Sequence, residues 1–187
     1  VKITNEEGEN AIGKPKGNYI AIDIKNLKLA QEDDIQKASE ILSNELRKLI
    51  DKHAGKQDEI LVVGLGNIYV TPDSLGPYTI DNIIVTRHLF KNGMNNVGYS
   101  EISGYSPGVM GTTGIETYDI IDAVIKKIDV DLVIVVDALA SRSIERVNKT
   151  IQITNAGICP GSGVGNKRKE LNKETIGKPV IAIGVPT

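Results

Sequence analysis

The sequence predicts a three-layer α/β fold, in which helices cover both faces of a mainly parallel or mixed sheet. Hydrophobic residues make up 40% of the 187-residue chain and aromatic residues only 4%, so the core must be almost wholly aliphatic. Aliphatic cores are typical of parallel strands that are buried on both faces. Apolar runs of strand length also alternate with stretches of helical spacing. Because no repeat or linker divides the chain, residues 1–187 are expected to form one domain.

The first half of the chain predicts two strands, two helices and a long loop. Residues 18–24 are a short β-branched run, and residues 33–53 place apolar side chains at helical spacing. Residues 59–66 are a continuous apolar run that ends in glycine, which indicates a buried strand. Residues 74–90 return to helical spacing after the sequence TPD. From residue 91 to 114 Gly, Asn, Ser, Tyr and Pro predominate, which predicts a surface loop with at most a short strand.

The second half continues the alternation. Residues 115–128 have helical spacing, and residues 130–140 are the most apolar strand in the chain. Residues 149–157 are a candidate for a further strand, and residues 159–170 form a glycine-rich loop with a small basic cluster. Residues 178–187 are another buried strand. Strands and helices in this order predict the three-layer architecture.

Composition excludes several classes of protein. A formal net charge of -2 leaves no basic surface of the kind that binds nucleic acid through many phosphates. One cysteine cannot form an internal disulfide, which favours a reducing, cytoplasmic location. No apolar run reaches the roughly 20 residues that span a bilayer, and no signal peptide is recognisable, so no membrane partner is expected. The chain starts at Val1 rather than methionine, which suggests a piece of something longer.

Two acidic residues follow the apolar runs. Asp73 comes shortly after the run that ends near Gly66, and Asp137 directly ends the run LVIVV. Ligands of open parallel sheets bind at the carboxyl ends of the strands. If the two strands are neighbours, both carboxyl groups reach the same crevice.

Each aspartate also has a structural interpretation. Asp73 lies in a plausible helix start, where aspartate is a preferred N-cap. Asp137 is costly to bury unless it has a partner or lies in a site, although it could cap a helix that starts near Ala138. A divalent metal bound by Asp73, Asp137 and His88 is a further alternative, but no CxxC, HxxxH or HExxH spacing supports a metal site.

The glycine motifs do not indicate a cofactor. Gly64 and Gly66 form G-x-G after a strand, but Tyr69 stands where a dinucleotide-binding fingerprint requires Gly or Ala. The segment GSGVGNKRK lacks the spacing of a phosphate-binding P-loop. Its basic residues Lys167, Arg168 and Lys169 are most simply a solvated surface.

Six blocks of the sequence are more specific than any of these motifs. They are VVGLGNIYVTPDSLGP, VTRHLF, PGVMGTTGIET, VVDALASRSIERVNKTIQI, GICPGSGVGNKRKE and PVIAIGVPT, in this order over residues 62–187. Together with the opening VKITNEEGENAIGKPKG, they closely resemble the spore germination protease family of endospore-forming bacteria. The resemblance covers essentially the whole chain.

This resemblance implies an endopeptidase that degrades small acid-soluble spore proteins during germination and cleaves after a glutamate. It implies a fold similar to that of the hydrogenase-maturation proteases (phosphorylase/hydrolase-like), an atypical aspartic mechanism and no cofactor. The family's catalytic aspartates fall in the TPD and VDALA motifs, which match Asp73 and Asp137. Family members are made as zymogens, assemble as homotetramers and act in the cytoplasm of the spore core. Relative to them, residues 1–187 are expected to be a catalytic core truncated at both ends.

The resemblance also implies a catalytic mechanism, to which alternative functions remain. Two neighbouring carboxyl groups share one proton, so one can act as base towards water while the other is a hydrogen-bond donor. Lys167 or Arg168 is expected to pair with the substrate glutamate, by charge complementarity. The rivals are a metal-binding hydrolase or maturation-type protease on the same fold, and a non-catalytic domain that binds an acidic peptide or a nucleotide.

Overall fold

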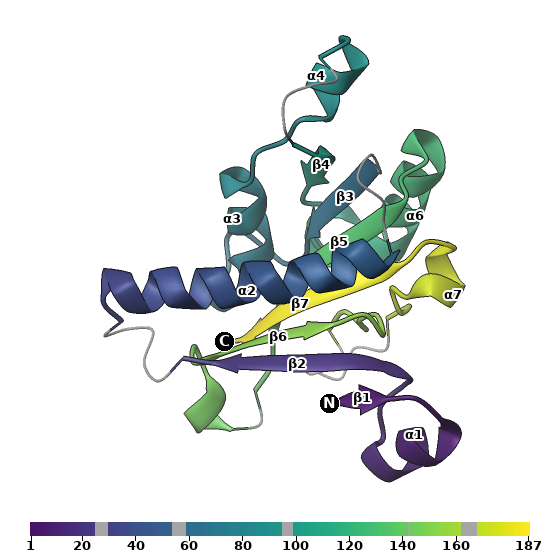
Figure 1. The fold of residues 1–187 in the computed structure, drawn as a ribbon. Coiled ribbons are helices and arrows are strands. Elements are labelled where there is room, and N and C mark those ends of the chain that lie inside the picture. Colours follow the sequence, from purple (N-terminus) through teal and green to yellow (C-terminus); the bar gives the residue numbers. More distant parts are fainter. Residues whose placement is uncertain (25–29, 54–58, 95–98, 142, 162–167) are drawn as a thin grey trace.

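A single mixed sheet organises the chain (Figure 1). The computed structural model describes residues 1–24, 30–53, 59–94, 99–141, 143–161 and 168–187. The sheet has seven strands in the order β1-β2-β6-β7-β5-β3-β4. The strands are β1 (Lys2–Ile3), β2 (Gly17–Asp23), β3 (Glu59–Gly64), β4 (Glu101–Tyr105), β5 (Leu132–Leu139), β6 (Thr150–Thr154) and β7 (Val180–Pro186).

One half of the sheet is parallel and the other half is antiparallel. The strands β4, β3, β5 and β7 run parallel to one another. The strand β6 is antiparallel to both β7 and β2, and β1 is antiparallel to β2. The predicted mixed or mainly parallel sheet is therefore confirmed, with β6 and β1 as its reversed strands.

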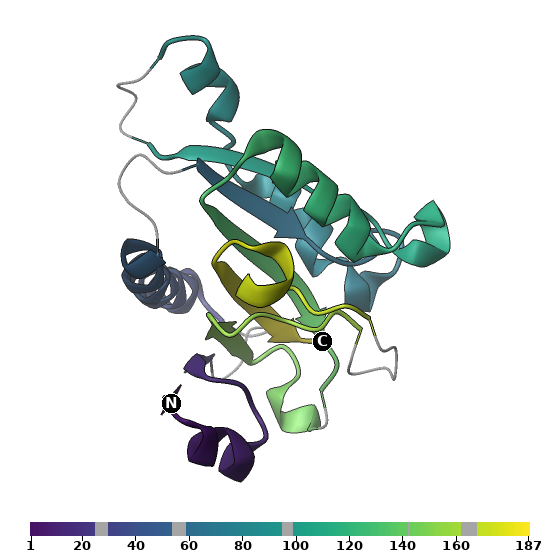
Figure 2. The same ribbon diagram turned by 90° about the vertical axis from the view of Figure 1, so that its right-hand side faces the viewer.

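Helices cover both faces of the sheet, as the three-layer prediction requires. The helices α2 (Glu32–His53) and α3 (Leu75–Asn82) pack on one face, over an aliphatic cluster that includes Ile134 and Ile181. The helices α6 (Thr117–Ile128) and α7 (Lys173–Ile176) pack on the other face, over Val133 and Val135. Figure 2 shows α6 and α7 on the side opposite α2. Burying one apolar face of each helix against this sheet is what holds the layers together.

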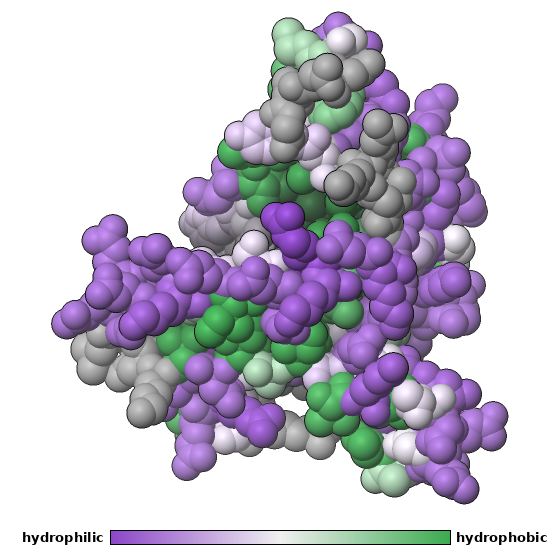
Figure 3. Space-filling model, viewed as in Figure 1, coloured by the Kyte–Doolittle hydropathy of each residue, from purple (hydrophilic) through white to green (hydrophobic). Residues whose placement is uncertain are grey.

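The helix α2 shows this division clearly. Leu42, Leu46 and Ile50 pack toward the sheet, and Leu49 is buried. The outer face of α2 is hydrophilic, and hydrophobic residues gather beside it where helix and sheet meet (Figure 3). Apolar positions three and four residues apart produce this stripe. The helix begins and ends within one residue of its predicted range.

The prediction of one helix over residues 74–90 is wrong. The structure has α3, then an extended stretch, then the short helix α4 (Arg87–Lys91). Thr86, buried in this stretch, donates its hydroxyl proton to the carbonyl oxygen of Ser100 and accepts the N–H of Ile102. These bonds tie the extended stretch after α3 to the start of β4. The predicted loop over 91–114 contains one short strand, β4, at the edge of the sheet, as the prediction allowed, and also the short helix α5 (Met110–Thr113).

Two N-terminal elements and one late helix were not predicted. They are β1, the helix α1 (Glu6–Ile12) and α7. Asn5 caps α1 by accepting the N–H of Gly8, and α7 begins with a capping box between Asn172 and Thr175. Among the described residues, no helix combines the length and apolar character that crossing a bilayer requires.

Candidate active site

Asp137 lies near the carboxyl end of β5, in the centre of the sheet. Five buried residues precede it in the strand, and only 8% of its own surface is exposed. The strand continues through Leu139, and no helix begins at Ala138. Asp137 is therefore not a helix cap, and its carboxyl group is a buried polar group at the end of an aliphatic strand.

Asp73 is held in a tight turn after β3. The turn ends in a single 3-10 turn, η1 (Thr71–Asp73), and α3 begins only after Ser74. The Asp73 carboxylate accepts the N–H of Asn67 at 2.9 Å, and the Asp73 carbonyl oxygen accepts the same N–H at 3.0 Å. The N-cap interpretation of Asp73 is therefore wrong, because its side chain faces back across the turn rather than into α3.

Glycines make this turn possible. Gly66 has a φ of 115°, a backbone conformation that other residues rarely adopt. A Cβ at Gly66 would lie 2.0 Å from the carbonyl oxygen of Asp73, and one at Gly64 would lie 2.2 Å from the carbonyl oxygen of Gly76. The G-x-G pair thus serves close packing of β3, the turn and α3, which explains its presence without a dinucleotide.

The neighbouring strands β3 and β5 bring the two aspartates together. Gly64 is paired with Val136, and the N–H of Leu65 donates to the carbonyl oxygen of Val136. The turn that carries Asp73 therefore starts beside Asp137. At the other side, Thr187 donates its hydroxyl proton to the carbonyl oxygen of Pro72 and its N–H to Leu139, which ties η1 to the ends of β5 and β7.

Burial and a second negative charge act on Asp137. Desolvation raises its pKa most, the charge of Asp73 raises it further, and a hydrogen bond from the N–H of Ala138 opposes both effects. The resulting pKa of Asp137 is about 7, against 3.8 for an ordinary aspartate. Asp137 therefore still holds a proton at pH values well above those at which an ordinary aspartate has lost it.

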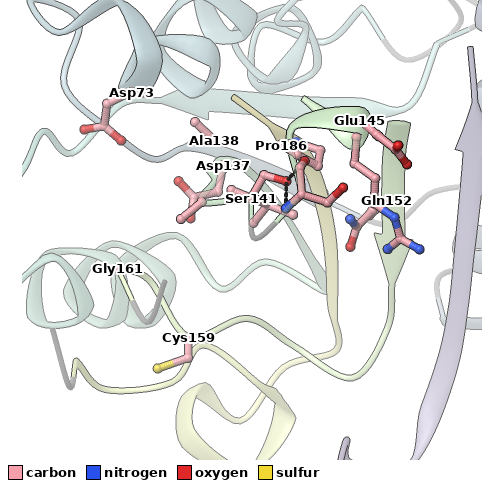
Figure 4. A pocket seen from close by; sticks show the side chains of 13 residues that line it. Asp73, Asp137, Ala138, Ser141, Glu145, Gln152, Cys159, Gly161 and Pro186 are labelled. Carbon is pink, nitrogen blue, oxygen red and sulfur yellow. Dashed lines mark hydrogen bonds between the residues drawn. The ribbon is translucent and has the colours of Figure 1, made fainter. Parts of the chain in front are cut away.

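Both carboxyl groups open into one pocket of about 680 Å³, here called the aspartate pocket. In Figure 4 they lie at one end of it, with Glu145 and Gln152 toward the other end. The lining residues come from the turn before α3, from β5 and the segment after it, from β6 and from the end of β7: Asp73, Asp137, Ala138, Leu139, Ala140, Ser141, Ser143, Glu145, Arg146, Gln152, Cys159, Gly161 and Pro186.

Arg146 and Gln152 are two of the lining residues that the sequence did not predict. Arg146 ends the 3-10 turn η2 (Ile144–Arg146) and is the one cationic side chain among the described residues that line the aspartate pocket. Gln152 reaches the pocket from β6. No local sequence pattern predicts either residue at the site. Both reach it because the chain reverses direction after β5 and returns as β6, antiparallel to β7.

The structure describes only one of the two predicted substrate-binding residues, Arg168. Lys167 lies outside the described residues. Arg168 is described, but its guanidinium is 3.5 Å from the carboxylate of Glu116 and does not line the aspartate pocket. Its carbonyl oxygen accepts a hydrogen bond from the thiol of Cys159, which does line the pocket. Arg168 therefore lies beside the pocket rather than inside it.

His88 does not join the aspartates. It lies in α4, whose residues Arg87 and Lys91 contact Glu59 and Glu101, the first residues of β3 and β4. That is the amino end of the parallel strands, whereas Asp137 lies near the carboxyl end. The described residues contain no group of three histidine, cysteine, aspartate or glutamate side chains arranged to hold a metal ion.

Comparison with known proteins gives the family. The model of the germination protease family matches residues 1–187. Proteins named germination protease from Geobacillus sp. (strain WCH70), Oceanobacillus iheyensis and Priestia megaterium are similar to this chain, with sequence identities of 54%, 53% and 52%. The alignments cover 100%, 98% and 100% of this chain, respectively. The chain spans about half the length of these curated relatives, 51% of each.

Among solved structures, the NiFe hydrogenase maturation protease HycI from Thermococcus kodakarensis KOD1 is similar with a TM-score of 0.41 and 18% identity. The similarity covers 74% of this chain and 80% of that one. The family match, in contrast, runs through every described element, including the turn of Asp73 and the strand of Asp137. The chain belongs to the germination protease family.

Proposed function

We propose that this chain is the catalytic core of an endopeptidase that works through Asp73 and Asp137. One observation supports this most: a buried carboxyl group, with a pKa of about 7, beside a second carboxylate in an open pocket. Perturbed pKa values at a cleft are typical of catalytic acids and bases. Two carboxyl groups with separated protonation states can supply one acid and one base, which is what peptide hydrolysis needs.

The roles proposed for the two groups follow their environments, with the protonated Asp137 as the acid. The Asp73 carboxylate takes a proton from water, and the resulting hydroxide attacks the scissile carbonyl carbon. The Asp137 carboxyl group donates a hydrogen bond to the oxygen, which becomes negative as the tetrahedral intermediate forms. The C–N bond then breaks, and a carboxyl proton passes to the leaving nitrogen. The products are a carboxylic acid and an amine. The pair has taken one proton from water and given one to the leaving nitrogen, so it returns to its singly protonated state.

The resemblance to the family supports the finer points of the proposal. The substrates are small acid-soluble spore proteins, degraded during germination in the cytoplasm of the spore core. The enzyme is made as a zymogen and assembles as a homotetramer, and this chain is the core of that longer protein. No nucleic acid, membrane or cofactor takes part.

A substrate glutamate before the scissile bond requires a cation near the aspartates. We place Arg146 in this role, because it is the cation among the described residues that line the aspartate pocket. The basic cluster of Lys167 and Arg168 is the second candidate, since Cys159 links Arg168 to the pocket wall. Arg168 would have to exchange Glu116 for the substrate carboxylate.

Replacement of the aspartates tests the proposal directly. Asp73→Asn and Asp137→Asn, made in the full-length protein, should each abolish cleavage of an acid-soluble spore protein while the fold is retained. Asp81→Asn, at an exposed position of α3, is the matched control and should cleave at the wild-type rate. Cleavage by both site variants at the wild-type rate would refute the mechanism.

Two further measurements separate the rivals. Activity that survives exhaustive chelation argues against a metal hydrolase. Binding of the substrate without cleavage, in every form of the full-length protein, would instead identify a peptide-binding domain.

A further inference from the structure

A second hollow continues the aspartate pocket across the sheet. Its volume is about 630 Å³, and its floor is formed by β2, β6 and β7, which lie side by side (Figure 1). Lys14, Pro15, Gly157, Ile158 and Glu170 are among the residues that line it. We call this hollow the sheet trough. It shares four lining residues with the aspartate pocket, so the two form one continuous depression: Leu139, Arg146, Gln152 and Cys159.

The strand register aligns the trough with the active site. Asp137 is paired with Gly184, Gly184 with Gln152, and Gln152 with Ala21. Directly paired residues present their side chains on the same face of a sheet. A straight row thus runs from the buried aspartate over β7 and β6 to β2. It crosses three strand spacings, about 14 Å, which an extended chain covers in about four residues.

The chemistry of this row suits a polypeptide backbone. Gly184 has no side chain, and the Leu139 side chain occupies the space above it, 2.5 Å from where a Cβ would lie. Ala21 has only a methyl group, so the floor is apolar at Leu139 and low at Ala21. Between them, the Gln152 amide carries both a donor and an acceptor, the two groups that a peptide bond presents. The charged side chains that line the trough are of both signs, Lys14, Asp23, Arg146 and Glu170, so the trough does not select a polyanion.

We propose that the sheet trough binds the substrate on one side of the scissile bond, as an extended segment of about four residues that runs from Asp137 across the Leu139 side chain, which covers Gly184, and over Gln152 to Ala21. This inference rests on the proposed peptidase function. It adds the place and direction of the substrate chain, which the two aspartates alone do not define.

The variant Ala21→Trp tests the inference at the far end of the row. Ala21 is exposed on β2, so an indole there fills the trough without entering the core. Ala123→Trp, at an exposed position of α6, is the matched control. Each full-length variant is assayed with a peptide extending at least five residues on both sides of the scissile bond, and with two peptides shortened to two residues on one side or the other.

The expected result depends on peptide length. Ala21→Trp should lower kcat/KM for the long peptide about tenfold or more, mainly through KM, because a binding segment is displaced. One of the two shortened peptides should be cleaved equally by the wild type and by Ala21→Trp, since it does not reach β2. Gln152→Met, which keeps the length of the side chain but removes the amide, should weaken the binding of the same long peptide.

Several outcomes would overturn the inference. Wild-type kinetics of Ala21→Trp with the long peptide would show that the trough is not used, while cleavage itself leaves the peptidase proposal intact. An equal loss with all three peptides would indicate a general effect. A gain in activity, or a changed oligomeric state, would assign the trough to another part of the protein or to a second copy. Failure of the wild type to cleave any peptide would refute the peptidase proposal together with the inference.

Discussion

Asp137 carries the strongest electrostatic perturbation among the described residues that line the aspartate pocket. A carboxylate near the end of a buried strand loses hydration, and the charge of Asp73 adds repulsion, so the proton is held more tightly. Asp73 differs because it is only partly buried and its carboxylate accepts the N–H of Asn67. The asymmetry of the pair therefore comes from the backbone positions of the two residues, since the side chains themselves are identical.

This asymmetry predicts how peptidase activity varies with pH. Asp137 has to keep its proton to act as the acid, and its pKa is about 7. The value of kcat/KM should therefore fall above pH 7, approaching tenfold per pH unit. The measurement is kcat/KM from pH 5 to 9 with one peptide. A rate that still rises at pH 9 would contradict the assignment of Asp137 as the proton donor.

Arg146 leads to a prediction about substrate choice. Arg146→Gln should lower kcat/KM for a peptide with glutamate before the scissile bond by roughly 10- to 100-fold, since a hydrogen bond between charged groups contributes about 1.5–3 kcal/mol. The same variant should cut the corresponding glutamine peptide almost as well as the wild type does. Arg168→Gln and Lys167→Gln are tested in parallel. If one of these loses the preference instead, the basic cluster binds the glutamate.

At the scale of elements, the turn between β3 and α3 positions Asp73. Gly66→Ala should distort this turn, because the added Cβ would lie 2.0 Å from the Asp73 carbonyl oxygen. A strained backbone conformation alone costs about 1–2 kcal/mol of folding free energy. We expect Gly66→Ala to lose more stability than this, together with a large loss of kcat. Gly177→Ala is the matched control: its φ is 71°, but nothing lies within 4 Å of the new Cβ.

Thermal unfolding and kcat, measured for both glycine variants, check this prediction. Gly177→Ala should lose some stability and keep its activity. Equal behaviour of the two variants would show that close packing at Gly66 does not position the aspartate.

The same elements show what could be predicted from sequence. The runs that became β3 and β5 were predicted because each is continuous and apolar, and Asp73 and Asp137 follow from the rule that sites lie at carboxyl ends of strands. Gln152 and Arg146 could not be found in this way. Their place depends on β6 running antiparallel to β7, which is a long-range pairing without a local signal. The break before α4 likewise depends on bonds from Thr86 to β4.

At the scale of the whole molecule, two aliphatic clusters stabilise the sheet from opposite faces, and the aspartate pocket lies where the parallel half meets the antiparallel half. The strands β5 and β7 lie in the middle of the sheet, so the aspartate pocket rests on its most buried part. A charge placed there costs folding free energy, which the rest of the core has to offset. The site should therefore lower the stability of the protein in a pH-dependent way.

Global unfolding measures this cost. Because the pKa of Asp137 rises from 3.8 to about 7 on folding, the folded protein binds more protons than the unfolded chain between these values. The contribution of Asp137 to the free energy of unfolding is therefore constant below about pH 4, falls as pH rises to 7, and is lower by up to about 4 kcal/mol above it.

Asp137→Asn removes this dependence, so it should be more stable than the wild type at pH 8 although inactive. Urea unfolding at pH 5 and pH 8 checks this, with Asp81→Asn as the control. Equal stability of Asp137→Asn and the wild type at pH 8 would mean that Asp137 is ionised at little cost, and that it is not the proton donor.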